Sequence, residues 1–387
     1  MNVHALPRLL LFARAVVAVI AAFSTFAGAS LAHGGEAPRR ALYVAPGGDD
    51  AGPGTRRAPL RSISAAASIA EASPGGITVH VAPGTYRENV RSAASGSASR
   101  RVRYVSTVKW GAKIIGGGTE AAWDNRGSHV EISGFDISGS GRAGILNYGS
   151  WVRMANNRVH DLALSGGCTG NGGGGIVNAN YKASDGDISG NVVHDIGAPG
   201  ACPGVHGIYY SNLRGRIQNN IVYRASAWGI HLWHAADRVI IANNTVFANG
   251  SDKVGGGIVV GTGDRPGGVV LTQTKVINNI VAWNPRASIR QYCYRGEDCI
   301  GDGNVVANNV VYGNGVDIEM RVGKASGTIA EDPRFIDFRP DGSGDYRLQR
   351  GSPALRRGLA SAAPATDIDG IRRPSGMAID IGAYQKH

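Results

Sequence analysis

Asparagine followed by β-branched residues recurs along the middle of the chain. The six copies are Asn156-Asn157-Arg158-Val159, Gly190-Asn191-Val192-Val193, Asn219-Asn220-Ile221-Val222, Asn243-Asn244-Thr245-Val246, Asn278-Asn279-Ile280-Val281 and Asn308-Asn309-Val310-Val311. The second residues of successive copies are 34, 29, 24, 35 and 30 positions apart. This spacing is typical of a solenoid, in which a fixed unit repeats with loops of variable length.

A second repeated motif lies between the asparagines. It is the dipeptide Gly-Ile, at Gly144-Ile145, Gly175-Ile176, Gly207-Ile208, Gly229-Ile230 and Gly257-Ile258. One unit therefore reads as strand, turn, strand, asparagine turn, strand and variable loop. Asparagine tolerates left-handed backbone angles in a tight turn, and stacked asparagines can hydrogen-bond along a solenoid. We predict an all-β chain, a right-handed parallel β-helix with three short strands per coil.

Both ends of such a solenoid need covering, because they expose apolar layers and unpaired strand edges. Apolar residues at helical spacing within 61–72 predict a short N-terminal cap helix. We expect an N-terminal strand and cap region over residues 40–92, the β-helix over 93–330, and the last coils with a closing segment over 331–387.

The N-terminus has the pattern of a secretory signal. Arg8 and Arg14 flank and interrupt an apolar stretch, and small residues follow it. We predict a signal peptide over residues 1–29, with Ala32 as the alternative cleavage point. A short membrane anchor is disfavoured because Arg14 breaks the apolar run. We therefore expect a secreted or periplasmic protein that does not insert into a membrane and acts as a monomer.

Composition and charge narrow the class of protein and partner. Glycine supplies 58 of 387 residues without a three-residue period, and 43% of residues are apolar. This composition excludes collagen and disorder and argues against a helical bundle. Without Arg8 and Arg14 the formal charge falls from +11 to +9. A basic exported protein suggests an acidic partner: a uronate polysaccharide, a lipopolysaccharide or nucleic acid. Nucleic acid fits poorly, because the basic residues are dispersed without interleaved aromatic residues.

The four cysteines fit the repeat. Cys168 and Cys202 each lie 11 residues after a repeat asparagine, so they occupy the same site on adjacent coils, roughly 5 Å apart. Cys293 and Cys299 can close a short surface loop. Two disulfides agree with an oxidising compartment, whereas a zinc site lacks the Cys-x-x-Cys spacing.

Motifs at both ends resemble a known group of proteins, the secreted bacterial right-handed β-helix proteins of the pectate-lyase-like superfamily, which include polysaccharide lyase family 9. The motifs are Tyr43-Val44-Ala45-Pro46-Gly47, Gly52-Pro53-Gly54-Thr55, Ala82-Pro83-Gly84-Thr85-Tyr86, Asp345-Tyr346-Arg347-Leu348, Gly351-Ser352-Pro353-Ala354 and Asp380-Ile381-Gly382-Ala383-Tyr384. The resemblance implies that a sugar chain lies along the sheet of the Gly-Ile strands. The acidic calcium ligands of family 9 are replaced here by Val205-His206-Gly207-Ile208-Tyr209 and its neighbour, so we expect no metal and no cofactor.

The residue after each isoleucine should point outward, because side chains alternate along a strand. The candidates concentrate on two adjacent coils: catalytic His206, Tyr209 and His231, and substrate-binding Lys182, Arg214, Trp228, Trp233 and His234. Lys182 and Arg214 each lie six residues after an isoleucine, and we expect them to be neighbours. Elimination from a uronate needs a cation for the C6 carboxylate, a base for the C5 proton and an acid for the leaving oxygen. We expect a metal-independent lyase or C5 epimerase acting on an acidic polysaccharide.

Two other functions stay open. The same patch could hold an acidic glycan without catalysis, and each candidate could be an ordinary exposed side chain. A glycoside hydrolase needs paired carboxylates, for which Asp317 and Glu319 on one strand are the candidates. His160 and His194 align with Tyr223, Phe247 and Tyr312. We expect these rings to form a stacking ladder without a catalytic role.

Overall fold

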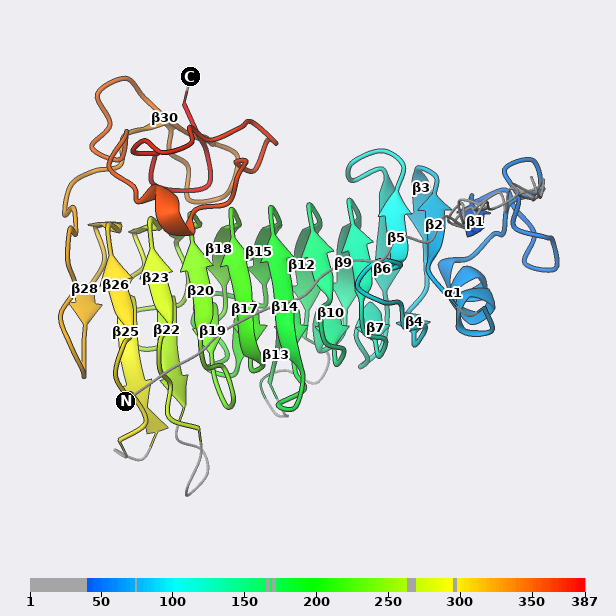
Figure 1. Cartoon of the computed structure of the whole chain (residues 1–387), viewed down its shortest axis with the longest axis horizontal. Coiled ribbons are helices and arrows are strands. Elements are labelled where there is room, and N and C mark those ends of the chain that lie inside the picture. The colour runs from blue at the N-terminus through cyan, green and yellow to red at the C-terminus, as the bar shows by residue number, and fades with distance from the viewer. Residues whose placement is uncertain are drawn as a thin grey trace, which may run out of the picture. The chain divides into compact units, whose positions relative to one another are not determined.

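The computed structural model describes residues 40–386, apart from Pro74 and the segments 165–167, 169–171, 263–268 and 295–297. The predicted signal peptide lies outside these residues. The described chain is an all-β right-handed parallel β-helix, and each coil contributes one strand to each of three parallel sheets (Figure 1). The predicted fold class is confirmed.

The three sheets, which we call A, B and C in chain order, have ten, nine and nine strands. Sheet A contains β1 (Arg40–Val44), β2 (Ile77–Val81), β5 (Val102–Ser106), β8 (Val130–Ser133), β11 (Arg153–Ala155), β14 (Ser184–Ser189), β17 (Leu213–Gln218), β20 (Val239–Ala242), β23 (Lys275–Ile277) and β26 (Val305–Ala307). Sheet B contains β3 (Gly84–Tyr86), β6 (Ala112–Gly116), β9 (Asp136–Ser140), β12 (Arg158–Ala163), β15 (Val192–Ile196), β18 (Ile221–Ala225), β21 (Thr245–Phe247), β24 (Ile280–Ala282) and β27 (Val310–Tyr312). Sheet C contains β4 (Val90–Ser92), β7 (Trp123–Asn125), β10 (Ala143–Asn147), β13 (Gly173–Asn178), β16 (Val205–Tyr210), β19 (Trp228–Leu232), β22 (Gly256–Thr262), β25 (Ala287–Cys293) and β28 (Val316–Glu319).

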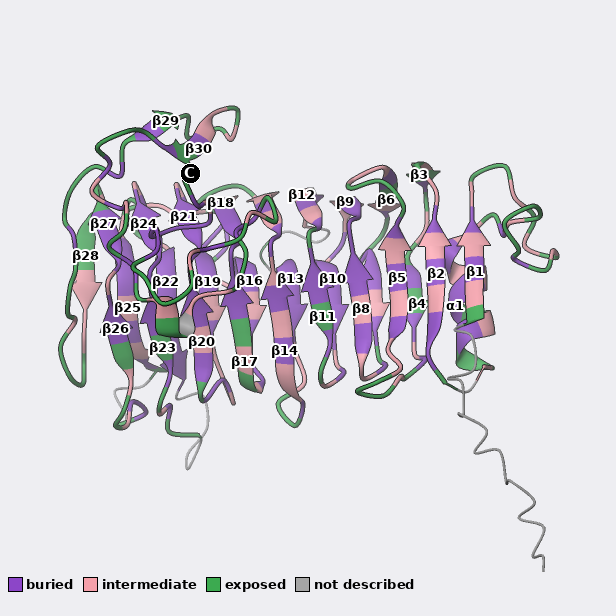
Figure 2. Ribbon diagram, turned by 45° about the horizontal axis from the view of Figure 1, so that its top comes forward, coloured by how far each residue is buried: buried purple, intermediate pink, exposed green. Residues whose placement is uncertain are grey.

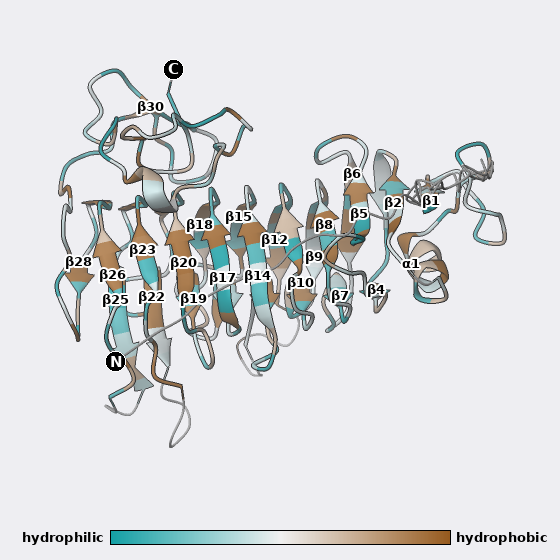
Figure 3. Ribbon diagram, in the orientation of Figure 1, coloured by the Kyte–Doolittle hydropathy of each residue, from teal (hydrophilic) through white to brown (hydrophobic). Residues whose placement is uncertain are grey.

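The interior is a stack of aliphatic rows, visible as buried and hydrophobic bands along the strands (Figures 2 and 3). One row consists of the five predicted isoleucines of sheet C and, on the following coil, Ile289, which the sequence analysis missed. They pair in register from coil to coil and are fully buried: Ile145, Ile176, Ile208, Ile230, Ile258 and Ile289. Burying a side chain of this size contributes about 1.5–3 kcal/mol, so the repeated row holds each coil to the next.

The glycine before each of the five predicted isoleucines also faces the interior. A Cβ on Gly207 would lie 2.5 Å from Cγ1 of Val222, and one on Gly229 would lie 2.5 Å from Cγ1 of Val246, both in sheet B. Two successive residues therefore point inward, and the residue before the glycine points outward. Strict alternation would turn His206 inward, so this break in alternation is what brings His206 to the outer face.

The repeat asparagines form the expected ladder between sheets A and B. In each coil the side-chain amide donates to the Oδ1 of the next asparagine, for example Asn220 to Asn244 at 2.9 Å and Asn244 to Asn279 at 2.9 Å. The residue before each repeat asparagine has left-handed backbone angles; it is glycine at Gly190 and asparagine in the other copies, such as Asn219 with φ 54°. Two further ladders that the sequence analysis missed run through Asn125, Asn147 and Asn178, and through Asn249, Asn284 and Asn314.

The predicted cap helix is α1 (Ile63–Glu71). Ser62 caps its N-terminus by accepting from the Ala65 amide at 3.1 Å, and the Glu88 carboxylate accepts from the amides of Ile63 and Ser64. A negative side chain at this position also complements the helix dipole. The helix buries four apolar residues against the first coils: Ile63, Ala66, Ala67 and Ala70.

The C-terminal segment packs on the outer face of sheet B. It contains the antiparallel pair β29 (Phe335–Asp337) and β30 (Asp345–Leu348) and a short 3₁₀ helix (Ala360–Ala362). Tyr223 and Phe247 of sheet B share an apolar cluster with Phe335 and Tyr346 of the segment. The predicted ring ladder is confirmed on this sheet from His160 to Phe247, with His160 stacked 5.0 Å from His194 and His194 stacked 4.7 Å from Tyr223. The prediction is wrong for Tyr312, because Ala282 lies between Phe247 and Tyr312 in the register of sheet B.

Both predicted disulfides are present. Cys168 bonds to Cys202 with Cα atoms 5.1 Å apart, and Cys293 bonds to Cys299 with Cα atoms 5.6 Å apart. The first joins two adjacent coils, as their equal distance from the repeat asparagines predicted. Within the part of the chain that the structure describes, no helix has the length and apolar character needed to cross a bilayer.

Candidate functional site

The candidate residues gather on the outer face of sheet C. Tyr209 pairs in register with His231, and Val177 and Val259 continue this row on either side. His206 belongs to the outward row before the glycines, and Trp233 follows His231 by two residues along the chain. Five predicted residues line one cavity of about 330 Å³: His206, Tyr209, His231, Trp233 and His234.

The two histidines of this cavity are hydrogen-bonded to each other. His206 Nε2 lies 2.8 Å from His231 Nδ1, and the backbone N–H of Trp228 donates to His206 Nδ1 at 3.3 Å. Because His206 Nδ1 accepts that bond, a neutral His206 carries its proton on Nε2 and donates it to His231. A neutral His231 then carries its own proton on Nε2. The backbone of Trp228 therefore fixes the tautomers of both rings.

Burial keeps both rings neutral. Burial lowers the pKa of His206 to about 3. Burial, together with the nearby His206 and His234, lowers the pKa of His231 well below its usual value of 6.5. Near neutral pH the pair therefore acts as a chain of hydrogen-bond donors and carries no positive charge.

Aromatic rings and a second polar pair border the histidines. The Tyr209 ring lies 5.3 Å from that of His231, edge to face, and 5.6 Å from that of His206. The hydroxyl of Tyr181 lies 2.8 Å from His234 Nε2, which links the loops that follow β13 and β19. Phenol and imidazole groups within hydrogen-bond distance can exchange a proton.

Arg142 is the one cation among the described residues that line this cavity, and the sequence analysis missed it. It directly precedes β10, lines the cavity and is half-buried. Among the described residues its guanidinium forms no ion pair, so its charge is available to an anion. Neighbouring glycines of the next coil, Gly172 and Gly173, line the same cavity and leave room beside it. The only feature of the sequence that pointed to Arg142 was its position next to a Gly-Ile strand.

The predicted pair of Lys182 and Arg214 is wrong. Ser184 pairs with Leu213 in sheet A, so the coil neighbour of Arg214 is Asp185. The guanidinium of Arg214 binds the Asp185 carboxylate at 2.8 Å and lines a different cavity, on sheet A. Lys182 is exposed in the preceding turn and does not line the histidine cavity. The chain after β16 enters sheet A at Leu213, one residue before Arg214, whereas β14 begins at Ser184, two residues after Lys182.

A second cavity of about 360 Å³ adjoins the first at His231 and Trp233. Trp228, predicted to bind substrate, faces this second cavity, together with Tyr292 and three cations: Lys253, Arg286 and Arg290. Neither cavity has an aspartate or glutamate among its described lining residues. The hydrolase candidate Glu319 is instead paired with Arg290 at 2.5 Å.

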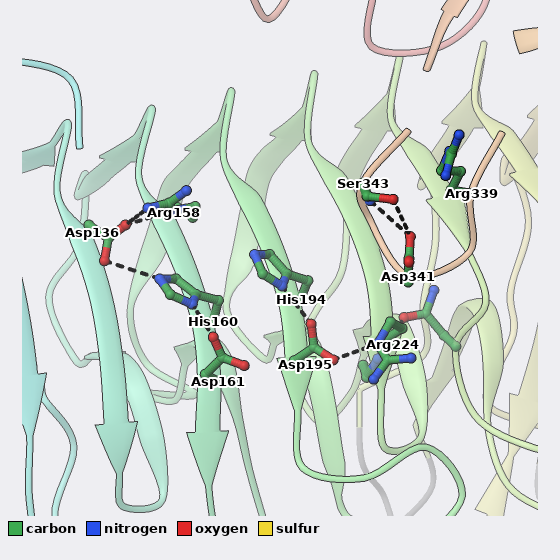
Figure 4. Close-up of polar contacts among 12 residues, drawn as sticks. Asp136, Arg158, His160, Asp161, His194, Asp195, Arg224, Arg339, Asp341 and Ser343 are labelled. Atoms are coloured by element: carbon green, nitrogen blue, oxygen red, sulfur yellow. Dashed lines mark hydrogen bonds and ion pairs between the residues drawn. The ribbon is translucent and has the colours of Figure 1, made fainter. Parts of the chain in front are cut away.

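Carboxylates and histidines do meet on sheet B (Figure 4). Asp136 binds His160 Nε2 at 3.0 Å and also pairs with Arg158, while His194 contacts Asp195 at 2.7 Å. Asp161 and Asp195 have left-handed backbone angles, with φ 45° and 51°. These carboxylates are occupied by their neighbours, so they stabilise the ring ladder. Among the described residues no group of three histidine, cysteine or acidic side chains could hold a metal ion.

Comparisons with known proteins agree with this architecture. Residues 112–311, more than half of the chain, match a family described as "Right handed beta helix region", and residues 46–93 match a family described as a protein of unknown function, DUF1565. No curated protein sequence matches. The solved structure of pectate lyase Pel9A is similar with a TM-score of 0.58 and 18% identity, covering 90% of this chain and 97% of that one. A rhamnogalacturonan lyase is similar with a TM-score of 0.53 and 16% identity, covering 81% and 96%. The chain belongs to the right-handed β-helix family, and it shares the fold of these two solved structures.

Proposed function

We propose that this protein acts on a uronate-containing polysaccharide by metal-independent β-elimination or C5 epimerisation. The observation that carries the proposal is the hydrogen-bonded pair of His206 and His231 beside Tyr209, in a cavity that also holds Arg142 and whose described lining has no carboxylate. Among the described residues, this lining offers hydrogen-bond donors and one cation and no acidic group, so it is complementary to a carboxylate.

Each group has a role in the proposed reaction. Arg142 binds the C6 carboxylate and stabilises the negative charge that spreads onto it when the C5 proton leaves. His231 presents a proton on Nε2 and not a lone pair, so it donates a hydrogen bond to substrate oxygen. His206 lies behind His231 and is a positioning residue.

Tyr209 is then the proton carrier. In its ionised form it takes the C5 proton; the C5–H electrons form the C4=C5 double bond and the bond from C4 to O4 breaks. Tyr209 returns the proton to O4, which balances the elimination. In epimerisation, C5 instead receives a proton from the opposite face, and the Tyr181–His234 pair is the candidate donor.

The two similar solved structures support the reaction type within this proposal. Their printed names are those of lyases for pectate and rhamnogalacturonan. From these names we propose for this protein only the reaction class, elimination, and we assign no particular sugar. The excess of basic residues favours an acidic substrate.

Glycan binding without catalysis is the second candidate. It is favoured by the aromatic rings and cations that continue into the second cavity, because stacking and charge alone hold a sugar chain. A hydrolase is disfavoured, since Glu319 is held by Arg290 and lines neither cavity.

A panel of acidic polysaccharides tests the proposal. The protein is incubated with each one in the presence of a chelator; ultraviolet absorbance detects the unsaturated product, and proton NMR detects inverted C5. Turnover with chelator present supports the proposal. Binding without either product on any member supports the second candidate, and loss of turnover on chelation would restore a role for a metal.

A further inference from the structure

The second cavity has a floor of flat aromatic rings. Trp228 lies over Gly256 of β22, where a Cβ would come within 2.7 Å of its ring, and Trp233 lies over Gly261 of the same strand, where a Cβ would come within 3.0 Å. Side chains at these two positions would lift the rings from the sheet. Because these two positions are glycines, both indole rings can lie flat on the sheet, along the direction in which the coils stack.

The ring surface continues to the next coil. Tyr292 in β25 stacks on Trp233 with ring centroids 5.9 Å apart and planes inclined by 19°. Trp228 is buried with Val259 and Ala287, so its ring is held in place. A fixed row of aromatic faces is suited to the apolar faces of sugar rings.

Three cations stand around this floor. Arg286 donates from Nη1 to the backbone carbonyl of Lys253 at 3.2 Å. Because this carbonyl is neutral, the bond does not neutralise the positive charge of the Arg286 or the Lys253 side chain. Arg290 lies over the Tyr292 ring at 5.3 Å and is paired with Glu319, which does not line the cavity. The described lining thus has a net positive charge, while its floor is aromatic.

We propose that this cavity is a second sugar subsite, built to hold a uronate residue of the same chain whose neighbouring residue reacts beside His231. This inference rests on the proposed function, because that function sets the direction in which the sugar chain lies. Because His231 and Trp233 border both cavities, a chain crossing sheet C passes from one into the other. The protein therefore selects substrates with acidic residues close together in the chain.

Binding measurements on the full protein test this proposal without requiring turnover. An oligouronate and its methyl-esterified, uncharged form are titrated by calorimetry into wild type, Arg286→Gln and Lys253→Gln. We expect each variant to bind the oligouronate about tenfold more weakly, as for loss of a charge-assisted contact, and the esterified form as wild type does. The matched control is Lys275→Gln, which removes the same charge from an exposed position on sheet A.

The outcomes separate the subsite from the reaction. If both variants bind the oligouronate as wild type does, the subsite is overturned, even where the protein is an active lyase. The subsite is also overturned if no acidic oligosaccharide binds better than its neutral form. If Arg286→Gln weakens charge-dependent binding but the protein forms no product from any polysaccharide, the subsite is supported and the proposed function is rejected.

Discussion

His206 donates from Nε2 to Nδ1 of His231 across 2.8 Å, and this bond decides what His231 can offer a substrate. A ring that accepts on Nδ1 holds its proton on Nε2 when neutral, so the edge that remains for substrate is a donor. The backbone N–H of Trp228 anchors the arrangement by occupying His206 Nδ1.

Nitrogen NMR of protein labelled at histidine checks this arrangement directly. We expect both rings to report the Nε2-protonated tautomer from pH 5 to 8. His206→Gln retains an N–H donor for His231 and should keep much of the activity, whereas His206→Leu should lower kcat about a hundredfold with little change in KM. Equal activity in the two variants would show that His206 only fills space.

Arg142→Gln should lower kcat/KM about a hundredfold, because the reacting carboxylate loses the cation of the cavity. The matched control is Arg214→Gln, which breaks the ion pair with Asp185 on sheet A and should leave kcat/KM near the wild-type value. Steady-state kinetics on one substrate compares the two. The reverse ranking would place the carboxylate site on sheet A.

Acid should destabilise the protein partly through the histidine pair. The folded-state pKa of His206 is about 3, and that of His231 is also lowered, so the unfolded chain binds more protons below pH 6.5. The free energy of unfolding is therefore unaffected by these groups above pH 6.5 and falls as the pH drops from 6.5 toward 3, by at most about 1.4 kcal/mol per pH unit for each ring.

Urea denaturation between pH 7 and pH 4 measures this slope. The double variant His206→Gln, His231→Gln should lose less stability over the interval than wild type, since neither replacement takes up a proton. Identical slopes in the two proteins would mean that other groups account for the acid sensitivity.

Removing the disulfide between Cys168 and Cys202 should cost more stability than removing the one between Cys293 and Cys299. The chain-entropy model gives roughly 4 kcal/mol for a separation of 34 residues and roughly 2 kcal/mol for a separation of 6. Denaturation midpoints of the two double-serine variants compare them. The first variant should also bind substrate more weakly, because Pro203 and Gly204 next to Cys202 line the histidine cavity.

Features that repeat with the coil were predictable from the sequence. The isoleucine row, the asparagine ladder and the pairing of Cys168 with Cys202 each depend only on equal spacing from coil to coil. The grouping of Tyr209 with His231 followed for the same reason, since neighbours in a parallel sheet keep their register.

Features that depend on loops and on packing across the interior were not predictable. Arg214 was misplaced because the loop before it turns into sheet A opposite Asp185. Arg142 was missed because its approach to the cavity depends on the glycines of the following coil. The outward direction of His206 required knowing that Gly207 packs against Val222 in another sheet.

The most direct test of the proposed reaction compares wild type with the double variant Tyr209→Phe, His231→Ala. Formation of unsaturated or C5-inverted uronate is followed with chelator present, while calorimetry measures oligouronate binding and circular dichroism checks the fold. We predict that the folded variant still binds the oligosaccharide and forms no product. Product formation at the wild-type rate would contradict the assignment of the reaction to this cavity.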